Sequence, residues 1–350
     1  MASKLSLLLF SIFIITFHIP KSVAIETDAE NSDNCRRVKS DDYFIDFASY
    51  QQNIIVAEDN FSLFLKESSQ NTGHLALIKH LESENVDLEE IQLENFPEGV
   101  SFHPSALYLV KPDQLYVLNY NANKMETRIE IFTIDSQFAK YHGSIYFDSS
   151  INGFFNDFLI ESDHTLYITK YFINENLADS YPISINNYIS LVNSNHLPNN
   201  VMQLYECTFF KHSYSDCQPM NFTLFNSVIG IVKDQFDNYY FSSKDDDGSY
   251  FLKKFTKDST GNFIEKNKIK TKEIIGKIKY DEENSKLYLA VSPKIIHFFK
   301  NLPGGIVEID PNSDNKKLST LIKNPRSMIR KNSTILISSY YEAGGYACNV

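Results

Sequence analysis

The sequence predicts an all-β fold, a six-bladed β-propeller in a single domain over residues 25–350. Two observations lead to this prediction. Short runs of alternating apolar and polar residues recur in pairs, and a polar turn separates the two members of each pair. The second members are centred near residues 55, 116, 167, 240, 288 and 336, so the later ones repeat about every 48 residues. That period is typical of one propeller blade built from short strands.

Residues 1–24 precede this domain and have the features of a secretory signal peptide. A single early lysine is followed by an apolar run over residues 5–17, and the small residues Ser22 and Ala24 stand where a signal peptidase cuts. The alternative is an uncleaved leader that serves as a signal anchor. The predicted location is therefore secreted or extracellular, or membrane-associated if the leader is retained.

Six pairs of short apolar runs predict six hairpins. The second runs are rich in Tyr, Ile, Val and Leu, and a polar turn precedes each of them. In chain order the pairs are YFIDF with NIIVAE, SALYLV with QLYVLNY, NDFLIE with TLYIT, IGIVKD with NYYFSS, GKIKYD with KLYLAV, and RSMIRK with TILISS. Six similar units predict six blades. The alternative is a β-sandwich whose strands resemble one another by chance.

One interval between the pairs is long enough to hold an extra element. Ile185, Tyr188, Ile189 and Val192 follow the i, i+3, i+4, i+7 spacing of one helix face, which predicts a short amphipathic helix. Four roles are open for the apolar face of this helix. They are packing against the rest of the protein, a lid, contact with a lipid or membrane surface, and a partner site.

Four cysteines in an oxidising compartment predict two disulfides. Cys207 and Cys217 flank the turn of a predicted hairpin, so they face each other across it. This leaves Cys35 and Cys348, one near each end of the mature chain. A propeller is a ring, and a first strand that completes the last blade would bring these two cysteines together and lock the closure.

Composition narrows the classes of partner. The net charge of −11 argues against nucleic acid as a partner, because binding to phosphates needs an excess of basic residues. Three Asn-X-Ser/Thr sequons, at Asn60, Asn221 and Asn332, predict glycosylation in the secretory pathway.

Seven segments connect the chain to a known family. In order they are NCRRVKSDD, FPEGVS, VLNY, ETRIEIF, NGFFNDFLI, LYITKYF and LISSYYEAGGYAC. On these segments the sequence resembles the serum paraoxonase/arylesterase family along nearly all of its mature length. The resemblance implies a propeller with a short helix over the channel mouth, one structural and one catalytic calcium ion in a central channel, and hydrolysis of aryl esters and lactones.

The resemblance also implies calcium ligands. The structural ion would lie between the carboxylate of Asp42, the backbone carbonyl of Val100 and the carboxylate of Asp157, while Asp41 and Asn156 would face the catalytic ion. Hard oxygen ligands of this kind suit Ca²⁺. A structural calcium ion is therefore the expected cofactor.

Three ligand positions for the catalytic ion are changed. Ile229 stands where the family has Asn, and Gly276 and Lys277 stand where it has Asp and Asn. Calcium takes about six to eight oxygen ligands, and an ammonium group would repel it, so the catalytic ion is predicted to be absent. The alternative is a rebuilt turn in which Asn226 serves as the ligand.

The catalytic base is also predicted to be lost. Glu98 and Tyr120 stand at the positions of the family's two catalytic histidines. An ordinary carboxylate is a much weaker base than an imidazole at neutral pH. His103 is expected to be an ordinary strand-edge residue.

Lys277 is the most informative of these changes. One hypothesis is that its ammonium replaces the catalytic cation and meets Asp41, Glu98 and the amide of Asn156, since a buried lysine needs carboxylate partners. The alternative is that Lys277 points to solvent from a loop of its blade.

Three functions remain open on the sequence alone. The first is a secreted calcium-binding propeller that has lost catalysis and acts as a binding or scaffold protein for an unknown protein partner. The second is an active calcium-dependent hydrolase of aryl esters or lactones. The third keeps the pocket without metal and uses Glu98, Asp41 and Lys277 as an acid/base set.

Overall fold

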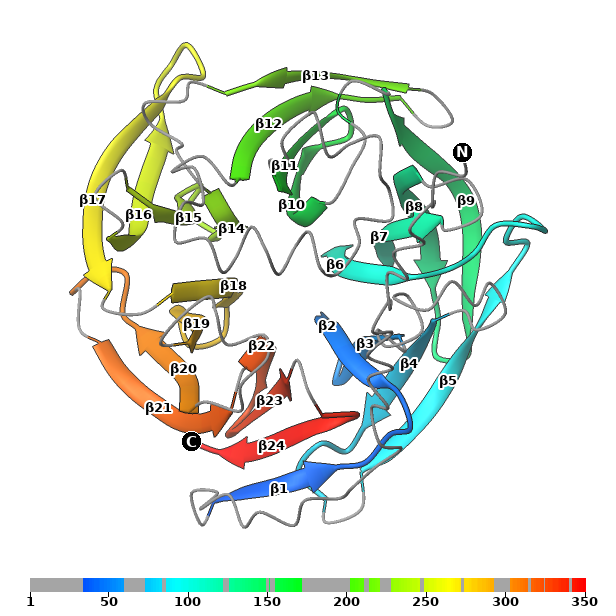
Figure 1. Cartoon of the computed structure of the whole chain (residues 1–350). Helices are drawn as coiled ribbons and strands as arrows, with labels where there is room; N and C mark the ends of the chain where they lie inside the picture. The colour runs from blue at the N-terminus through cyan, green and yellow to red at the C-terminus, as the bar shows by residue number, and fades with distance from the viewer. Residues whose placement is uncertain are drawn as a thin grey trace, which may run out of the picture.

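The computed structural model describes residues 34–59, 73–83, 86–121, 126–148, 151, 155–171, 202–210, 214–220, 228–245, 249–271, 274–292, 303–313, 316–323, 325–339 and 342–350. Within these ranges the protein is all-β, with 24 strands and no helix. The strands lie around a common centre in a propeller-like arrangement (Figure 1).

The first half of the chain forms strands β1 to β13. Their bounds are β1 Cys35–Val38, β2 Tyr43–Tyr50, β3 Asn53–Asp59, β4 His74–Lys79, β5 Asp87–Glu94, β6 Pro104–Val110, β7 Gln114–Asn121, β8 Glu126–Ile134, β9 Phe138–Phe147, β10 Phe155–Ser162, β11 Thr165–Tyr171, β12 Met202–Thr208 and β13 Tyr214–Pro219.

The second half forms strands β14 to β24. Their bounds are β14 Val228–Lys233, β15 Tyr239–Lys244, β16 Tyr250–Lys257, β17 Phe263–Thr271, β18 Ile274–Asp281, β19 Lys286–Ser292, β20 Pro303–Ile309, β21 Lys316–Lys323, β22 Pro325–Lys331, β23 Thr334–Ser339 and β24 Gly345–Asn349.

The structure contains all six predicted hairpins. They are the antiparallel pairs β2–β3, β6–β7, β10–β11, β14–β15, β18–β19 and β22–β23. The sequence predicted them because each pair consists of two short runs rich in β-branched and aromatic residues, separated by a polar turn.

The strands group into antiparallel sheets in chain order. Strands β14 to β17 form one sheet and β18 to β21 another, while β2 to β13 belong to a twelve-stranded sheet. That larger sheet is held together by short parallel pairings at its rim, where β9 pairs with both β5 and β13. The last sheet has the order β1-β24-β23-β22, so the first strand completes it.

The strands nearest the centre of Figure 1 are β2, β6, β10, β14, β18 and β22. Each of them contacts the next one around the centre, and β22 contacts β2. The polar groups of these six strands therefore meet in the middle of the molecule.

Apolar clusters lie between neighbouring sheets. One joins Phe44 and Phe47 of β2 to Ile329 of β22, and another joins Tyr167 of β11 to Phe241 of β15. Sheets that are covered on both faces bury nearly continuous apolar runs, as in β3, where Ile54, Ile55, Val56 and Ala57 are all buried. These clusters fix the sheets around the centre.

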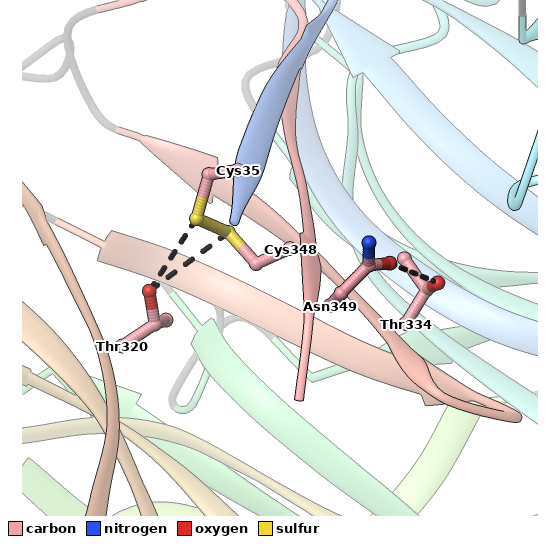
Figure 2. Close-up of a disulfide and its surroundings, with 5 residues drawn as sticks. All are labelled: Cys35, Thr320, Thr334, Cys348 and Asn349. Carbon is pink, nitrogen blue, oxygen red and sulfur yellow. Dashed lines mark hydrogen bonds between the residues drawn. A yellow bond between two sulfur atoms is a disulfide. The ribbon is translucent and has the colours of Figure 1, made fainter. Parts of the chain in front are cut away.

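Two disulfides are present, on the pairings expected from the sequence. Cys35 of β1 is bonded to Cys348 of β24, which are direct register partners (Figure 2). The hydroxyl of Thr320 lies 3.5 Å from the Cys35 sulfur, and the same figure shows both sulfurs facing this side chain. Cys207 and Cys217 are bonded across the β12–β13 pair. Disulfides are compatible with an extracellular location.

Several expectations fall outside the described residues. These are the leader at residues 1–24, the helix at residues 185–192, the sequons at Asn60 and Asn221, and the alternative ligand Asn226. Asn332 is described; it lies in an exposed turn, and its amide donates to Glu82. Nowhere in the described ranges is there a helix long and apolar enough to cross a bilayer.

Candidate functional site

Each of the six strands nearest the centre contains a β-bulge close to its start. In β2, for example, Phe44 pairs with Glu58 and Asp46 pairs with Ala57, which leaves Ile45 as the extra residue. A bulge changes the direction of the strand and re-aims the neighbouring side chains and carbonyls. The extra residues are Ile45, Ser105, Asn156, Ile229, the pair Gly276 and Lys277, and the pair Arg326 and Ser327.

The bulges explain why the resemblance singled out these positions. Asn156, Ile229, Gly276 and Lys277 are all bulge residues, and all had been assigned to the catalytic ion or its replaced ligands. The starts of all six innermost strands therefore lie in one central region, and Asn156, Ile229, Gly276 and Lys277 belong to it.

Asp46 is the carboxylate at this centre. Its side chain is fully buried, and it receives hydrogen bonds from three neighbouring strands. The Ser327 hydroxyl of β22 donates to Oδ1 over 2.6 Å, and the backbone N–H of Leu107 in β6 donates to Oδ2 over 2.9 Å. The third neighbour is β18, which supplies two lysines.

Lys277 and Lys279 of β18 both form ion pairs with Asp46. Lys277 Nζ lies 2.8 Å from Oδ2, and it also donates to the carbonyl of the bulge residue Ser105 over 3.1 Å. Lys279 Nζ lies 3.0 Å from Oδ1 and 3.0 Å from the carbonyl of Phe47. The Asp46 carboxylate thus connects β2 to β18, and its remaining hydrogen bonds come from β6 and β22.

These contacts correct the expectations for Lys277. Its side chain is only 5% exposed, so the alternative that it points to solvent is wrong. The hypothesis of a buried cation holds, but its partner is Asp46, which the sequence analysis did not single out, rather than Asp41 or Glu98. The bulge at Gly276 and Lys277 turns the lysine into the centre.

The charges of the cluster determine its protonation. Burial by itself raises the pKa of Asp46, but the Lys277 and Lys279 ammonium groups outweigh burial and hold that pKa well below its ordinary value. Burial lowers the pKa of Lys277, and the Asp46 carboxylate opposes this effect. Asp46 is therefore ionised at neutral pH, and the two lysines stabilise its charged form.

The charges of Lys277 and Lys279 also act on Asp157 of β10. Burial raises its pKa to about 6, and the positive charge of Lys277 opposes the rise. Its Oδ2 accepts from the backbone N–H of Ile231 over 3.2 Å, and its neighbour Asn156 donates to the carbonyl of Ile229 over 2.7 Å. These two side chains connect β10 to β14.

The expected structural calcium ligands do not come together as side chains. Asp42 is surrounded electrostatically by His74, Glu58, Asp59 and Asp41, whereas the charged neighbours of Asp157 are Lys277, Lys279 and Asp46. Among the described residues, no group of three or more His, Cys, Asp or Glu side chains is placed to hold a metal ion.

The described side chains therefore do not fit the calcium site that the resemblance implied. The charged neighbours of Asp157 include Lys277 and Lys279, whose positive charges oppose the binding of a cation there. Calcium binding by this chain stays a prediction.

The remaining predicted site residues lie in different surroundings. Asp41 and Glu98 are exposed, and Val100 is half-buried in the turn between β5 and β6. Tyr120 is buried in β7, and its backbone N–H donates to the carbonyl of His103 over 3.1 Å. No described contact joins Glu98 or Asp41 to Lys277, so the proposed metal-free acid/base set is not assembled by these residues.

His103 lies directly before the first residue of β6. It is buried at the start of the β6 region, and its Nδ1 lies 3.2 Å from Oδ2 of Asp59. Its backbone N–H donates to the side chain of Asn119, so the residue is fixed on two sides. This position, directly before β6, agrees with the expected strand-edge residue, and the contacts with Asp59 and Asn119 are those of a buried structural side chain.

A sequence signal for Asp46 does exist. In FIDF an acidic residue stands between Ile45 and Phe47, both of which are buried. A charge inside an apolar strand is rare unless it is paired, so this carboxylate required a buried cation elsewhere in the chain. Lys277, which is flanked by isoleucines in IIGKIKYD, is the matching signal.

Comparisons with known proteins complete the description. No family model matches the sequence, and no curated protein matches it either. A virginiamycin B lyase from Staphylococcus aureus aligns over 90% of this chain and 99% of its own, at 9% identity and a TM-score of 0.44. The computationally designed Ika8 protein aligns over 89% and 97%, at 6% identity and a TM-score of 0.42.

A functionally unknown protein from Desulfotomaculum acetoxidans aligns over 89% of this chain and 91% of its own, at 9% identity and a TM-score of 0.40. Since all three TM-scores are this low, the function has to be argued from the chain's own residues.

Proposed function

We propose that this chain is a paraoxonase/arylesterase-like propeller of six blades that has exchanged hydrolysis for a binding or scaffold function. The observation that carries the proposal is the buried ion pair between Lys277 and Asp46, whose charged atoms are 2.8 Å apart. It places a fixed cation of the protein itself in the region where the resemblance implies a catalytic metal ion.

The chemistry of ester and lactone hydrolysis explains why this exchange matters. A metal ion at such a site polarises the substrate carbonyl and stabilises the developing oxyanion. An ammonium whose donors already serve Asp46 and the carbonyl of Ser105 has little capacity left for a substrate. The positions of the family histidines hold an exposed Glu98 and a buried Tyr120.

The blade count rests on repetition within the chain. Six hairpins, each with a bulge near the start of its first strand, favour six blades. Since β1 pairs with β24 and is bonded to it through Cys35 and Cys348, the first and last segments complete one blade together. A closed ring of this kind is a stable platform for a binding surface.

The two disulfides also bear on the compartment in which the protein folds. Two disulfides favour an oxidising compartment, and we infer a secreted protein, or one that its leader holds at a membrane. An unknown protein partner is the expected ligand of the scaffold. Contact with a lipid surface through residues 185–192 is the other candidate interaction.

The test is calcium stoichiometry together with hydrolysis. The purified full chain is treated with chelator, dialysed, and titrated with Ca²⁺ by calorimetry, and hydrolysis of phenyl acetate and of an aliphatic lactone is measured with and without the ion. We expect at most one bound ion and no calcium-dependent hydrolysis. Two bound ions with calcium-dependent turnover would overturn the proposal in favour of an active arylesterase or lactonase.

A double variant makes the test sharper. Gly276→Asp combined with Lys277→Asn restores the oxygen ligands of the family at the β18 bulge. We expect this variant to bind one more calcium ion than the parent chain, because the repelling ammonium is replaced by oxygen donors. Lys279→Asn is the control, since it removes a positive charge from the same cluster without restoring the ligand pair.

A further inference from the structure

A second site lies away from the centre, between the first strands of the chain and the segment that connects β5 to β6. It is a cavity of about 330 Å³, a volume within the range of small-molecule sites. It is lined by the start of β4, the middle of β5 and the connecting segment. The side chains that define it are His74, Glu90, Leu93, Phe96, Val100 and Phe102.

One wall of the cavity is aromatic and fixed. Phe96 and Phe102 meet edge to face with ring centroids 5.4 Å apart, and Phe96 also stacks on Phe132 with centroids 6.0 Å apart. Phe102 and Phe132 are buried in the core cluster beneath, so the wall does not depend on the ligand for its order. Leu93 and Val100 extend the apolar surface.

The charges around the cavity are mostly negative. Glu90 lines it directly, and two further carboxylates lie behind His74. Glu58 is 1% exposed and its Oε2 lies 2.8 Å from His74 Nε2, while Oδ2 of Asp42 lies 3.7 Å from Nδ1. Three carboxylates thus surround one imidazole, and both ring nitrogens of that imidazole face carboxylates of the protein.

We propose that this cavity binds a small organic cation, namely an amine or quaternary ammonium group attached to an aromatic or aliphatic body. The cationic head lies beside Glu90, and the body packs against Phe96 and Leu93. An aromatic face attracts a cation by its quadrupole, so the phenylalanine wall and the carboxylates favour the same kind of ligand. An anion of the same size is repelled by Glu90 and by the two carboxylates behind His74.

This inference does not rest on the proposed function of the centre, although Val100 of the cavity and the nearby Asp42 are also calcium ligands that the resemblance implies. The cavity uses the outermost strand β5 and the connecting segment, whereas Asp46 and Lys277 belong to the innermost strands (Figure 1). Loss of hydrolysis at the centre would neither create nor abolish this site.

The experiment compares three ligands of one shape. Phenethylammonium, 2-phenylethanol and phenylacetate share a phenyl ring and differ mainly in the charge of the head group. Each is titrated into the full chain by calorimetry at neutral pH and low salt. We expect saturable binding of the cation only, at least about ten times tighter than binding of the alcohol. Equal binding of phenylacetate, or no saturable binding of the cation, would overturn the proposal.

Two single substitutions on β5 locate the site. Glu90→Gln removes the carboxylate that lines the cavity, and we expect it to weaken phenethylammonium binding about tenfold. Glu89→Gln removes the same charge from the adjacent residue, which is paired with Lys79 at 2.6 Å and does not line the cavity. We expect it to leave the affinity unchanged within about twofold. A similar loss in both variants would show only a general charge effect and would contradict the site.

A third variant tests the aromatic wall. Phe96→Leu keeps most of the apolar volume and removes the ring, so phenyltrimethylammonium, whose phenyl body packs against Phe96, should bind several-fold more weakly. The urea midpoint of each variant is measured first, so that a loss of affinity can be separated from a loss of folding. Unchanged affinity of a folded Phe96→Leu for the quaternary ligand would contradict the assigned orientation.

Discussion

At the scale of single residues, the carboxylate of Asp46 does most to define the centre. It accepts from Ser327, Leu107, Lys277 and Lys279, which come from three different strands. Removing one partner of a buried ion pair is costly because the other charge loses its solvation as well as its partner. The lysine at position 277 therefore has a structural role.

Lys277→Met should lower the free energy of unfolding by about 3 kcal/mol, since Asp46 keeps only Lys279 to offset its buried charge. Lys279→Met is the matched control. Its side chain is 20% exposed, and Asp46 then keeps the shorter ion pair, so the expected loss is about 1 kcal/mol. Urea denaturation of both variants checks the difference, and equal losses would contradict the central role of Lys277.

The pH dependence of stability follows from the same group. The pKa of Asp46 is lower in the folded protein than in the unfolded chain, so the stability that it contributes is present above the unfolded pKa of about 3.9. That contribution is lost as pH falls through the folded pKa. Asp46→Asn should be less stable than the parent at pH 7, and the gap should narrow as pH falls below about 4.

Unfolding free energies at pH 7, 5 and 3 test this expectation for the parent and for Asp46→Asn. A gap that stays constant over this range would show that the carboxylate has no special ionisation in the folded protein. Asp113→Asn, which changes a carboxylate in a half-buried surface turn, controls for the change in net charge.

The contacts between side chains were the part of the site that could be predicted least well from the sequence. Sequence reasoning found Lys277, because an ammonium in a ligand position is conspicuous, but it assigned the wrong partners. Asp46 and Lys277 are 231 residues apart in the chain, and no local pattern records such a pairing. The same holds for His103 and Asp59, which are 44 residues apart and meet only in the folded protein.

At the scale of elements, the repeated bulge is the main feature that links local structure to the site. Each innermost strand begins with a paired residue, inserts one extra residue relative to its partner strand, and then resumes its pairing. The hairpins could be predicted from alternation of apolar residues. The bulges could not, because each lies so close to the start of its strand that too few residues precede it to show the change in alternation.

Glycine at position 344 offers a test at this scale. Its φ is +71°, and an added Cβ would lie 2.2 Å from the carbonyl oxygen of Val38, so Gly344→Ala combines backbone strain with a clash at the junction of β1 and β24. Gly261 has a φ of +86° and open space around its Cβ position, which makes Gly261→Ala the control for strain alone.

We expect Gly261→Ala to cost about 1 kcal/mol of unfolding free energy and Gly344→Ala at least about twice as much. Thermal or urea denaturation measures both. If the two substitutions cost the same, the close approach of β24 to the end of β1 contributes nothing to stability.

At the scale of the whole molecule, the two disulfides differ in what they enclose. The Cys35–Cys348 bond closes a loop of 313 residues, whereas Cys207–Cys217 closes one of 10. In the chain-entropy model the long loop is worth about 6 kcal/mol and the short one about 3 kcal/mol. Replacing both cysteines of the first pair by alanine should therefore lower the urea midpoint more than replacing both of the second.

The same comparison tests the pairing of the terminal strands. Without its disulfide, β1 is held to β24 by backbone hydrogen bonds over four residue pairs. We expect hydrogen exchange to accelerate first in β1 and β24 in the Cys35→Ala, Cys348→Ala variant, and to stay unchanged there in the Cys207→Ala, Cys217→Ala variant. Faster exchange throughout both variants would argue against closure by the terminal strands.

The pairing of β1 with β24 also constrains how the protein is made. At about 5 to 20 residues per second, the ribosome completes β24 roughly 15 to 60 s after β1, and during this time β1 lacks its partner strand. Cys35 is a free thiol throughout that interval, while Cys207 and Cys217, 10 residues apart, emerge together. The short disulfide can therefore form first, which removes the two thiols with which Cys35 could mispair before Cys348 arrives.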